Sequence, residues 1–270
     1  MSKNRTPRSF LIGIALFGLL APSASLAAIT GREIMDEQRQ RHGARSEETR
    51  SVMKLINSRG RERSRQMVTY SRTVDGDLSQ SLLKFLAPSS IRNTGLLTWE
   101  QPEDKEDQQW LYLPASKRVN QISGSNKKNL FMGSDLAYED LRPENLDAHS
   151  YELLREEDVD GEGCWVIEAL PATEKERGDS GYSKRIFWIR KDLYLTIKIE
   201  FFDRAEKLAK RGTYSQLEQI EGDSWRSNEI TMERLGTGST TVWSFTERHV
   251  NEDIDENLFT QQGLKRPSRL

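Results

Sequence analysis

The chain has 270 residues, of which 30% are charged and 35% hydrophobic, and its 40 Lys and Arg against 42 Asp and Glu give a formal net charge of −2. Because positive and negative residues alternate along nearly every segment, the one-signed basic stripe of a nucleic-acid-binding protein is excluded. The single cysteine, Cys164, cannot form an internal disulfide, so the hydrophobic core alone must hold the fold.

The first 27 residues have the composition of a secretory signal peptide. Three basic residues precede the apolar run 10–20, and Ser25-Leu26-Ala27 is a small-x-small cleavage sequence. The apolar run is shorter than the roughly 20 residues that span a bilayer, so we do not expect it to be a transmembrane anchor. We therefore expect cleavage near Ala27 and a periplasmic mature chain, residues 28–270, which forms one domain because no linker rich in Pro, Ser or Gly divides it.

Few helices are expected. Thr30-Gly-Arg-Glu33 is a capping box, which predicts a helix from about residue 31 to about His42. A second, shorter helix is expected to begin at Ser134 or Asp135, whose side chains can cap its first amides, and to stop before Pro143. Two such helices cannot cover both faces of a large sheet, so the sheet itself must curl around its apolar face.

From residue 50 onward, segments of strand length are separated by turn signals. The turn signals are Asp75-Gly76, Asp160-Gly161, Gly178 to Gly181, Lys191-Asp192, Gly222-Asp223 and Gly236 to Gly238. In 194–202, Leu195, Ile197, Ile199 and Phe201 are expected on one face and the polar residues between them on the other. This pattern predicts a mainly β (α+β) protein, with a curved antiparallel sheet that forms an incomplete barrel and a helical lid or plug on its concave side.

The concave side of such a sheet offers an apolar cavity whose wall consists of large apolar side chains. The candidates for ligand binding are Leu83, Phe85, Leu97, Trp99, Trp110, Tyr112, Trp188, Ile197, Ile199, Phe201, Trp243 and Phe245. Each can equally serve plain core packing, and the sequence does not indicate which face is concave. Cys164, in the run Cys-Trp-Val-Ile, is expected to lie buried in a strand.

Residues 131–141 form a motif that allows two interpretations. Its distinctive residues are Phe131, Met132, Gly133, Ser134, Asp135, Tyr138, Glu139 and Asp140. As a lid or docking element, its first two residues would present apolar surface, Gly133 would be a hinge, and the three acidic residues would face a partner. As a structural element, Gly133 would supply a special backbone conformation, Asp135 a helix cap and Tyr138 a packed anchor, and this is the interpretation that we favour.

The string Gly178-Asp-Ser-Gly181 also occurs around the nucleophile of trypsin-like proteases. A nucleophilic Ser180 needs a general base, and none of the three histidines of the chain lies in the context of such a protease. Ser125 and Lys128 have the spacing of a nucleophile and a lysine, but they lie in a polar loop without a partner motif. We therefore expect no catalytic residue and no enzyme activity.

Metal and cofactor motifs are absent from the sequence. It contains no His-Glu-x-x-His, no Cys-x-x-Cys-His, no phosphate-binding glycine-rich loop and no EF-hand loop, so we expect no metal site and no cofactor. The acidic runs Glu103 to Asp107 and Glu156 to Asp158 are typical of solvated turns that keep sheet edges apart.

Several short motifs together resemble the outer membrane lipoprotein-sorting protein family, the periplasmic relatives of the LolA and LolB carriers. They are Gly31 to Met35, Leu83 to Pro88, Gly95 to Trp99, Trp110 to Pro114, Lys117 to Val119, Ile122 to Gly124, Phe131 to Asp135, Tyr138 to Leu141, Gly181 to Lys184, Trp188 to Arg190, Ile199 to Asp203 and Phe259. The resemblance covers essentially the whole mature chain. It implies a LolA-like incomplete barrel with a helical lid and an apolar interior that shelters a lipid, lipoprotein acyl chains or another lipophile between the two membranes.

Members of this branch are often associated with RND-type (MMPL-like) exporters, so the resemblance also implies such an inner-membrane partner. Two functions remain open: a monomeric carrier with transient membrane contact, or a non-enzymatic accessory protein that docks on the exporter. A carrier is expected to have a large apolar cavity, and an adaptor a filled core.

Overall fold

The computed structural model describes Met1 and residues 28–102 and 105–268. The expected signal peptide, residues 1–27, lies outside the described residues except for Met1. None of the helices in the described ranges is long and apolar enough to cross a membrane.

The strands of the described residues form one 13-stranded sheet. They are β1 (Ser46–Ile56), β2 (Glu62–Val74), β3 (Leu78–Ala87), β4 (Gly95–Trp99), β5 (Gln108–Leu113), β6 (Arg118–Gln121), β7 (His149–Val159), β8 (Glu162–Pro171), β9 (Tyr182–Arg190), β10 (Leu195–Asp203), β11 (Leu208–Glu221), β12 (Ser224–Arg234) and β13 (Ser239–Val250). The order across the sheet is β6-β5-β4-β3-β2-β1-β13-β12-β11-β10-β9-β8-β7. Neighbours are consecutive in the chain except β1 and β13, which join its two halves, and β6 and β7 are the edges.

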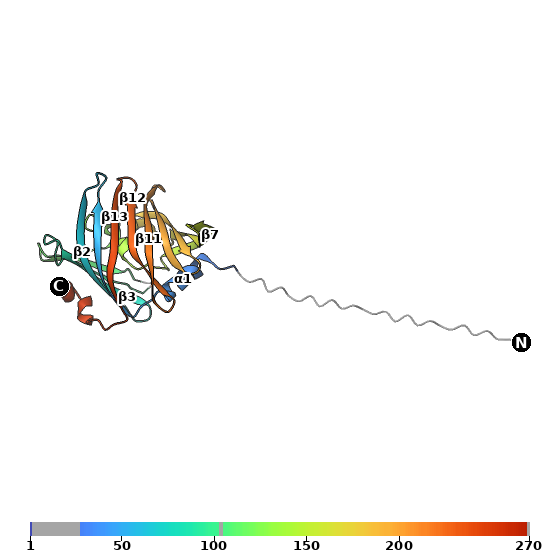
Figure 1. The fold of residues 1–270 in the computed structure, drawn as a ribbon, viewed down its shortest axis with the longest axis horizontal. Helices are drawn as coiled ribbons and strands as arrows, with labels where there is room; N and C mark the ends of the chain where they lie inside the picture. Colours follow the sequence, from blue (N-terminus) through green and yellow to red (C-terminus); the bar gives the residue numbers. More distant parts are fainter. Residues whose placement is uncertain (2–27, 103–104, 269–270) are drawn as a thin grey trace.

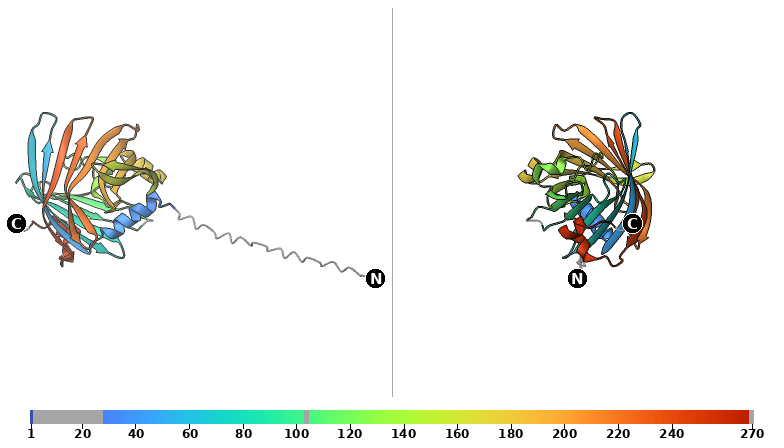
Figure 2. Two further views of the ribbon diagram at one scale, coloured as in Figure 1. Left: turned by 45° about the vertical axis from the view of Figure 1, so that its right-hand side comes forward. Right: turned by 90° about the vertical axis from the view of Figure 1, so that its left-hand side faces the viewer.

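The sheet is antiparallel and strongly curved. Register shifts interrupt several ladders, for example between Arg50 and Ser51 and between Thr196 and Lys198. Such bulges bend the strand and increase its twist. The sheet therefore curls around the segment that joins its edge strands but does not close (Figures 1 and 2). This confirms the predicted incomplete antiparallel barrel, and Cys164 is fully buried in β8 as expected.

The predicted first helix is confirmed as α1 (Gly31–Arg41), with both hydrogen bonds of the Thr30 and Glu33 capping box. It lies along the open end of the curved sheet. Arg41 stacks over the ring of Tyr194 at 4.4 Å, and the Thr196 hydroxyl donates to Gln38 at 2.7 Å. A Cβ atom on residue 31 would lie 2.9 Å from the carbonyl oxygen of Tyr151, so glycine lets the helix begin against β7.

The predicted second helix is wrong. Only the 3-10 turn η2 (Glu139–Leu141) forms there. Met132 and Gly133, just before the segment, have positive φ values of 48° and 78°. Within the segment, the Tyr138 amide donates to the carbonyl of Asn129 and not to a carbonyl four positions earlier, so the hydrogen bonds of a helix do not form. The remaining helices are short: η1 (Gly124–Lys128), α2 (Glu174–Asp179), η3 (Glu256–Phe259) and α3 (Gln261–Lys265).

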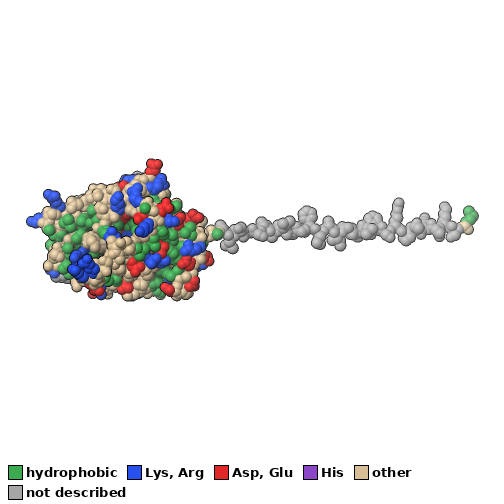
Figure 3. All heavy atoms as spheres, turned by 90° about the horizontal axis from the view of Figure 1, so that it is seen from above, with side chains coloured by type: hydrophobic (Ala, Val, Ile, Leu, Met, Phe, Trp, Pro, Cys, Tyr) green, Lys and Arg blue, Asp and Glu red, His purple; other side chains and the backbone are tan. Residues whose placement is uncertain are grey.

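The outer face of the N-terminal half of the sheet is covered by the C-terminal segment. Phe259 and Leu264 pack there on Leu82, Leu97 and Trp110. The exposed surface seen in Figure 3 carries apolar, basic and acidic side chains intermixed, as the charge pattern of the sequence predicts. The acidic run Glu156 to Asp158 lies on the edge strand β7, where it discourages pairing with another sheet.

Candidate functional site

The concave face of the sheet is the candidate site, because it is lined by buried apolar side chains from both halves of the chain. They are Met53, Met67, Leu83, Phe85, Leu96, Leu111, Trp165, Ile167, Ala169, Phe187, Ile189, Ile199, Phe201, Met232 and Trp243. In the same cluster lie Ile34 and Met35 of α1 and the buried residues of the segment 122–148, which we call the plug. In the described residues the concave face is therefore packed with side chains of the plug and of α1, where we expected an open apolar cavity.

The structure divides the twelve predicted ligand-binding residues between three clusters. Leu83, Phe85, Ile199, Phe201, Trp243 and Phe245 belong to the concave cluster. Leu97, Trp99, Trp110 and Tyr112 lie on the opposite face, under the C-terminal segment. Trp188 and Ile197 pack around Cys164 in a small cluster of their own. Only the first group stays a set of candidates for ligand contact.

Ile197 was assigned to the wrong face because of a bulge. Strict alternation groups it with Ile199, but the ladder with β9 shifts between Thr196 and Lys198. Thr196 consequently points to the concave side, where it bonds Gln38 of α1, while Ile197 packs in the cluster with Trp188. One extra residue in a strand moves the side chains beyond it to the opposite face of the sheet, and no turn signal in the sequence marks such a bulge.

The plug is attached to the sheet mainly by side chains. Within residues 123–147, the backbone-to-backbone hydrogen bonds of the described structure are internal to the plug, such as Phe131 N to Leu136 O at 2.7 Å and Tyr138 N to Asn129 O at 3.0 Å. Phe131, which is fully buried, stacks on Phe85 with ring centroids 5.6 Å apart. The plug thus fills the concave side without being a strand of the sheet.

Buried polar contacts fix the plug at three strands of the C-terminal half, β13, β11 and β9. The Asp135 carboxylate accepts from Ser239 at 2.5 Å and from Thr241 at 2.8 Å on β13. Asp140 forms an ion pair with Lys210 of β11, whose side chain is only 6% exposed. Tyr182 also donates to Asp140, at 2.8 Å. These contacts join residues far apart in the sequence, and no local pattern identifies them.

The lid interpretation of the motif 131–141 therefore needs correction. Phe131 does not present apolar surface, and Asp135, Glu139 and Asp140 do not form an exposed acidic edge, because each carboxylate accepts hydrogen bonds inside the protein. The structural interpretation is confirmed for Gly133 and for the buried Tyr138, which meets Phe131 edge to face. Asp135 anchors the plug to β13 and caps no helix.

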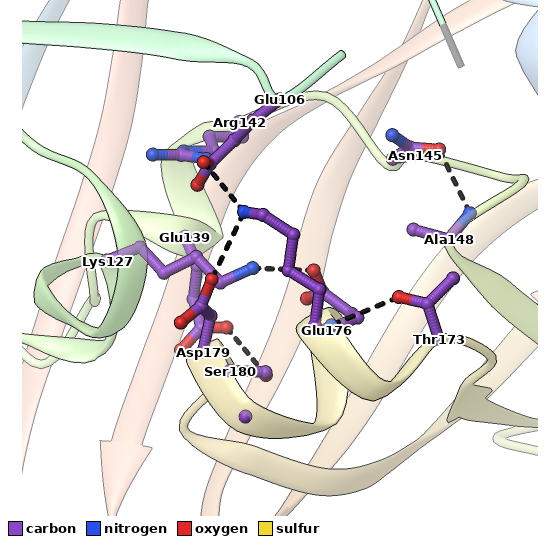
Figure 4. A network of polar contacts seen from close by, with 12 residues as sticks. Glu106, Lys127, Glu139, Arg142, Asn145, Ala148, Thr173, Glu176, Asp179 and Ser180 are labelled. Carbon is purple, nitrogen blue, oxygen red and sulfur yellow. Dashed lines mark hydrogen bonds and ion pairs between the residues drawn. The ribbon is translucent and has the colours of Figure 1, made fainter. Parts of the chain in front are cut away.

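A polar cavity of about 320 Å³ lies beside the plug. It is lined by charged residues of the plug, α2 and the loop before β5, and Figure 4 shows the network that they form. Lys127 pairs with Glu176 at 2.6 Å, and Lys175 with Glu106 at 2.7 Å. The Ser180 hydroxyl donates to Glu139 at 2.8 Å. Charged residues in the wall of this cavity thus pair with one another and join the plug to α2.

Deeper in this network, Arg185 makes a two-pronged ion pair with Glu144 at 2.6 and 2.7 Å. Its guanidinium also approaches His149 Nε2 at 2.9 Å, and His149 Nδ1 lies 3.1 Å from the carbonyl of Asn145. Since a guanidinium only donates, His149 Nε2 must accept and Nδ1 must carry the proton. Burial and the adjacent Arg185 lower the pKa of His149, so the imidazole is neutral in the folded protein.

We expect the stability contributed by His149 to depend on pH below neutrality. The pKa of His149 is lower in the folded protein than the ordinary value of 6.5, which applies to the unfolded chain. The stability contributed by the neutral imidazole is therefore complete above pH 6.5, and it is lost as the pH falls from 6.5 through the lower pKa of the folded protein. We would measure the free energy of unfolding of wild type and His149→Asn in urea between pH 7.5 and 5. The difference between the two should shrink by up to about 1.4 kcal/mol for each unit by which the pH is lowered.

The exposed histidine provides the control for that measurement. His249 has a side chain that is 54% exposed, so His249→Asn should change the free energy of unfolding by no more than about 0.5 kcal/mol. A stability difference for His149→Asn that does not change with pH would contradict the neutral buried imidazole.

Comparisons with known proteins agree with this architecture. A family model with the description "Uncharacterized protein" matches residues 77–266. An outer membrane lipoprotein-sorting protein domain from Vibrio parahaemolyticus is 33% identical with a TM-score of 0.82, and the match covers 87% of this chain and 98% of that one. A DUF1329 family protein from Desulfovibrio piger is 29% identical with a TM-score of 0.81, covering 87% of this chain and 97% of that one. No curated protein matches the chain.

The curved open sheet with its internal plug places the protein in the LolA-like class of folds. A LolA superfamily protein from Nitrosomonas europaea has the same fold at 20% identity, with a TM-score of 0.69 and coverage of 87% of this chain and 100% of that one. The chain belongs to the outer membrane lipoprotein-sorting protein family, as the identity to the Vibrio domain over nearly its whole length shows.

Proposed function

We propose that the protein is a periplasmic carrier that binds a lipid or lipoprotein acyl chains on the concave face of its sheet, in the space that the plug occupies. It acts by noncovalent sequestration, without a catalytic step. The observation that carries this proposal is the apolar concave face closed by a segment that is not part of the sheet. Membership in a lipoprotein-sorting family and the signal-like N-terminus support the same compartment and cargo class.

The energetics of acyl binding fit this arrangement. Burying a methylene contributes about 0.8 kcal/mol, so ten methylenes contribute about 8 kcal/mol before ordering costs. Displacing the plug exposes the apolar side chains Phe131, Leu136 and Tyr138, which the ligand must replace on the concave face. The plug can leave without breaking a sheet ladder, because side-chain contacts hold it. An acyl chain and the plug are therefore competitors for one surface.

Locking the plug tests whether the ligand enters by displacing it. The amide of Asp135 donates to Thr241 Oγ1 at 2.9 Å, so these two positions are in contact and are the pair at which we would introduce a disulfide. In a Cys164→Ala background, we expect oxidised Asp135→Cys/Thr241→Cys protein to bind a fluorescent acyl probe at least about tenfold more weakly than the reduced form. Reduction should restore binding. Equal binding by both forms would contradict entry through plug displacement.

A packed interior also favours the second candidate, an accessory protein that docks on an RND-type inner-membrane exporter. Native mass spectrometry and lipid extraction of the mature protein, purified from a periplasm without harsh detergent, separate the two functions. A stoichiometric lipophile supports the carrier. A protein that is empty and takes up no acyl probe supports the adaptor.

A further inference from the structure

Four hydrogen-bond donors of neighbouring strands have no partner in the part of the chain that the structure describes. Ser51 Oγ, Thr69 Oγ1, Arg65 Nη1 and Trp243 Nε1 are shielded from solvent, and none makes a hydrogen bond within the described residues. Leaving a buried polar atom unpaired costs about 1–3 kcal/mol, so four on adjacent strands are unusual for a region that serves only as core.

The sheet register brings these residues together. Met53 of β1 pairs with Arg65 on one side and with Trp243 on the other, so all three lie in one row across β2, β1 and β13. Ser51 lies two residues from Met53 and therefore faces the same side. The concave cluster contains Met53 and Trp243, which places the donors on the concave face.

Arg65 differs from the other cations that face the interior. Lys210 pairs with Asp140, and Arg185 pairs with Glu144, whereas Arg65 has no carboxylate partner among the described residues. Its guanidinium lies over the ring of Phe85, 5.6 Å from the centroid. Burial lowers the pKa of Arg65, and the neighbouring Arg63 adds to this effect. A cation in this position lacks the anion that would stabilise it.

The plug passes over these donors. Phe131 rests on Phe85 of β3, and four residues later Asp135 bonds Thr241 of β13, so the intervening chain crosses β2 and β1. Arg65 and Ser51 lie on those two strands. A ligand that displaces the plug therefore meets the unpaired donors directly.

We infer that Arg65 receives the anionic headgroup, a carboxylate or a phosphate, of an amphiphile whose acyl chain lies on the concave face, where Ser51 and Trp243 follow on the next two strands. This inference rests on the proposed carrier function and narrows its cargo to anionic amphiphiles. A guanidinium presents several donors in a fixed fork that matches both anions. The hydroxyl and the indole N–H supply further donors, while the surrounding apolar side chains hold the chain.

The test compares cis-parinaric acid, a fluorescent fatty acid, with its methyl ester, which has the same chain and no charge. We expect the mature wild-type protein to bind the acid about 10- to 100-fold more tightly, the range of charge-assisted hydrogen bonds. Arg65→Gln should remove this preference by lowering the affinity for the acid and not for the ester, and Arg65→Lys should retain part of the preference. Arg63→Gln is the matched control, because Arg63 is exposed on the same strand.

The outcomes are distinct. Equal affinity of wild type for the acid and the ester would overturn the headgroup site, and so would a preference for the acid that Arg65→Gln retains. Either result would leave the proposed carrier function standing. If the protein binds neither probe, both the headgroup site and the carrier function are overturned. Binding of inorganic phosphate that depends on Arg65, without preference for the acid, indicates a free-anion site instead. Because the described residues offer Arg65 no hydrogen bond or ion pair that the substitution could remove, the melting temperature of Arg65→Gln should stay unchanged or rise, and a clear fall would make Arg65 a structural residue.

Discussion

Replacement of Phe131 by alanine is expected to lower the free energy of unfolding by about 3–5 kcal/mol, the usual cost of truncating a buried phenylalanine. Phe131 is fully buried between the rings of Phe85 and Tyr138, at centroid distances of 5.6 Å to each. Because side chains hold the plug, hydrogen exchange of the Phe131 and Tyr138 amides should also accelerate. Urea unfolding and exchange measured by mass spectrometry check both effects.

The adjacent residue gives the matched control. Leu130 is 37% exposed, so Leu130→Ala removes a similar apolar volume from a position that is not enclosed. Its cost should be clearly smaller, and exchange within the plug should change little. If the two alanine variants lose the same stability, Phe131 does not anchor the plug.

The second large effect is expected from Lys210→Met. The side chains of Lys210 and Asp140 are 6% and 5% exposed, and breaking a buried pair by removing one partner costs about 3–5 kcal/mol, since the other charge stays buried alone. The ammonium also lies 4.8 Å from the ring of Tyr182 and 4.6 Å from that of Phe201. Unfolding in urea should show the loss.

A double-mutant cycle separates the ion pair from packing. Lys210→Met combined with Asp140→Asn should cost much less than the sum of the single changes, because no unpaired charge remains. Lys207→Met, at an exposed position three residues away, should stay within about 0.5 kcal/mol of wild type. Additive single effects would show that the pair does not couple the plug to β11.

The regular parts of the fold could be predicted because their signals are local. The capping box at Thr30 and Glu33 defines the start of α1, and the turns Asp75-Gly76 and Asp160-Gly161 connect the strands of the hairpins β2–β3 and β7–β8. Trp243 and Phe245, two residues apart in β13, lie together in the concave cluster, as the alternation of a strand predicts. Each of these features depends on residues within a few positions of one another.

The candidate site was less predictable because its decisive contacts are long-range. Asp140 meets Lys210 across 70 positions, and Asp135 meets Thr241 across 106. These bonds, together with left-handed Met132 and Gly133, hold the plug in an irregular path where a helix was expected. Likewise, Phe259 of the C-terminal segment covers Leu97 and Trp110. Apolar strand residues are therefore buried on both faces of the sheet, and composition alone could not identify which face is concave.

The pairing of β1 with β13 has a consequence for how the protein folds. Every other ladder joins strands that follow each other in the chain, whereas this seam brings together partners such as Glu47 and Arg248, 201 positions apart. Closing so long a loop is entropically unfavourable and slows folding. Two meandering sheets can form as the chain emerges, but the β1 edge of the first stays unpaired until β13, the last strand, has been made. A factor that shields this edge until then would raise the yield of folded protein.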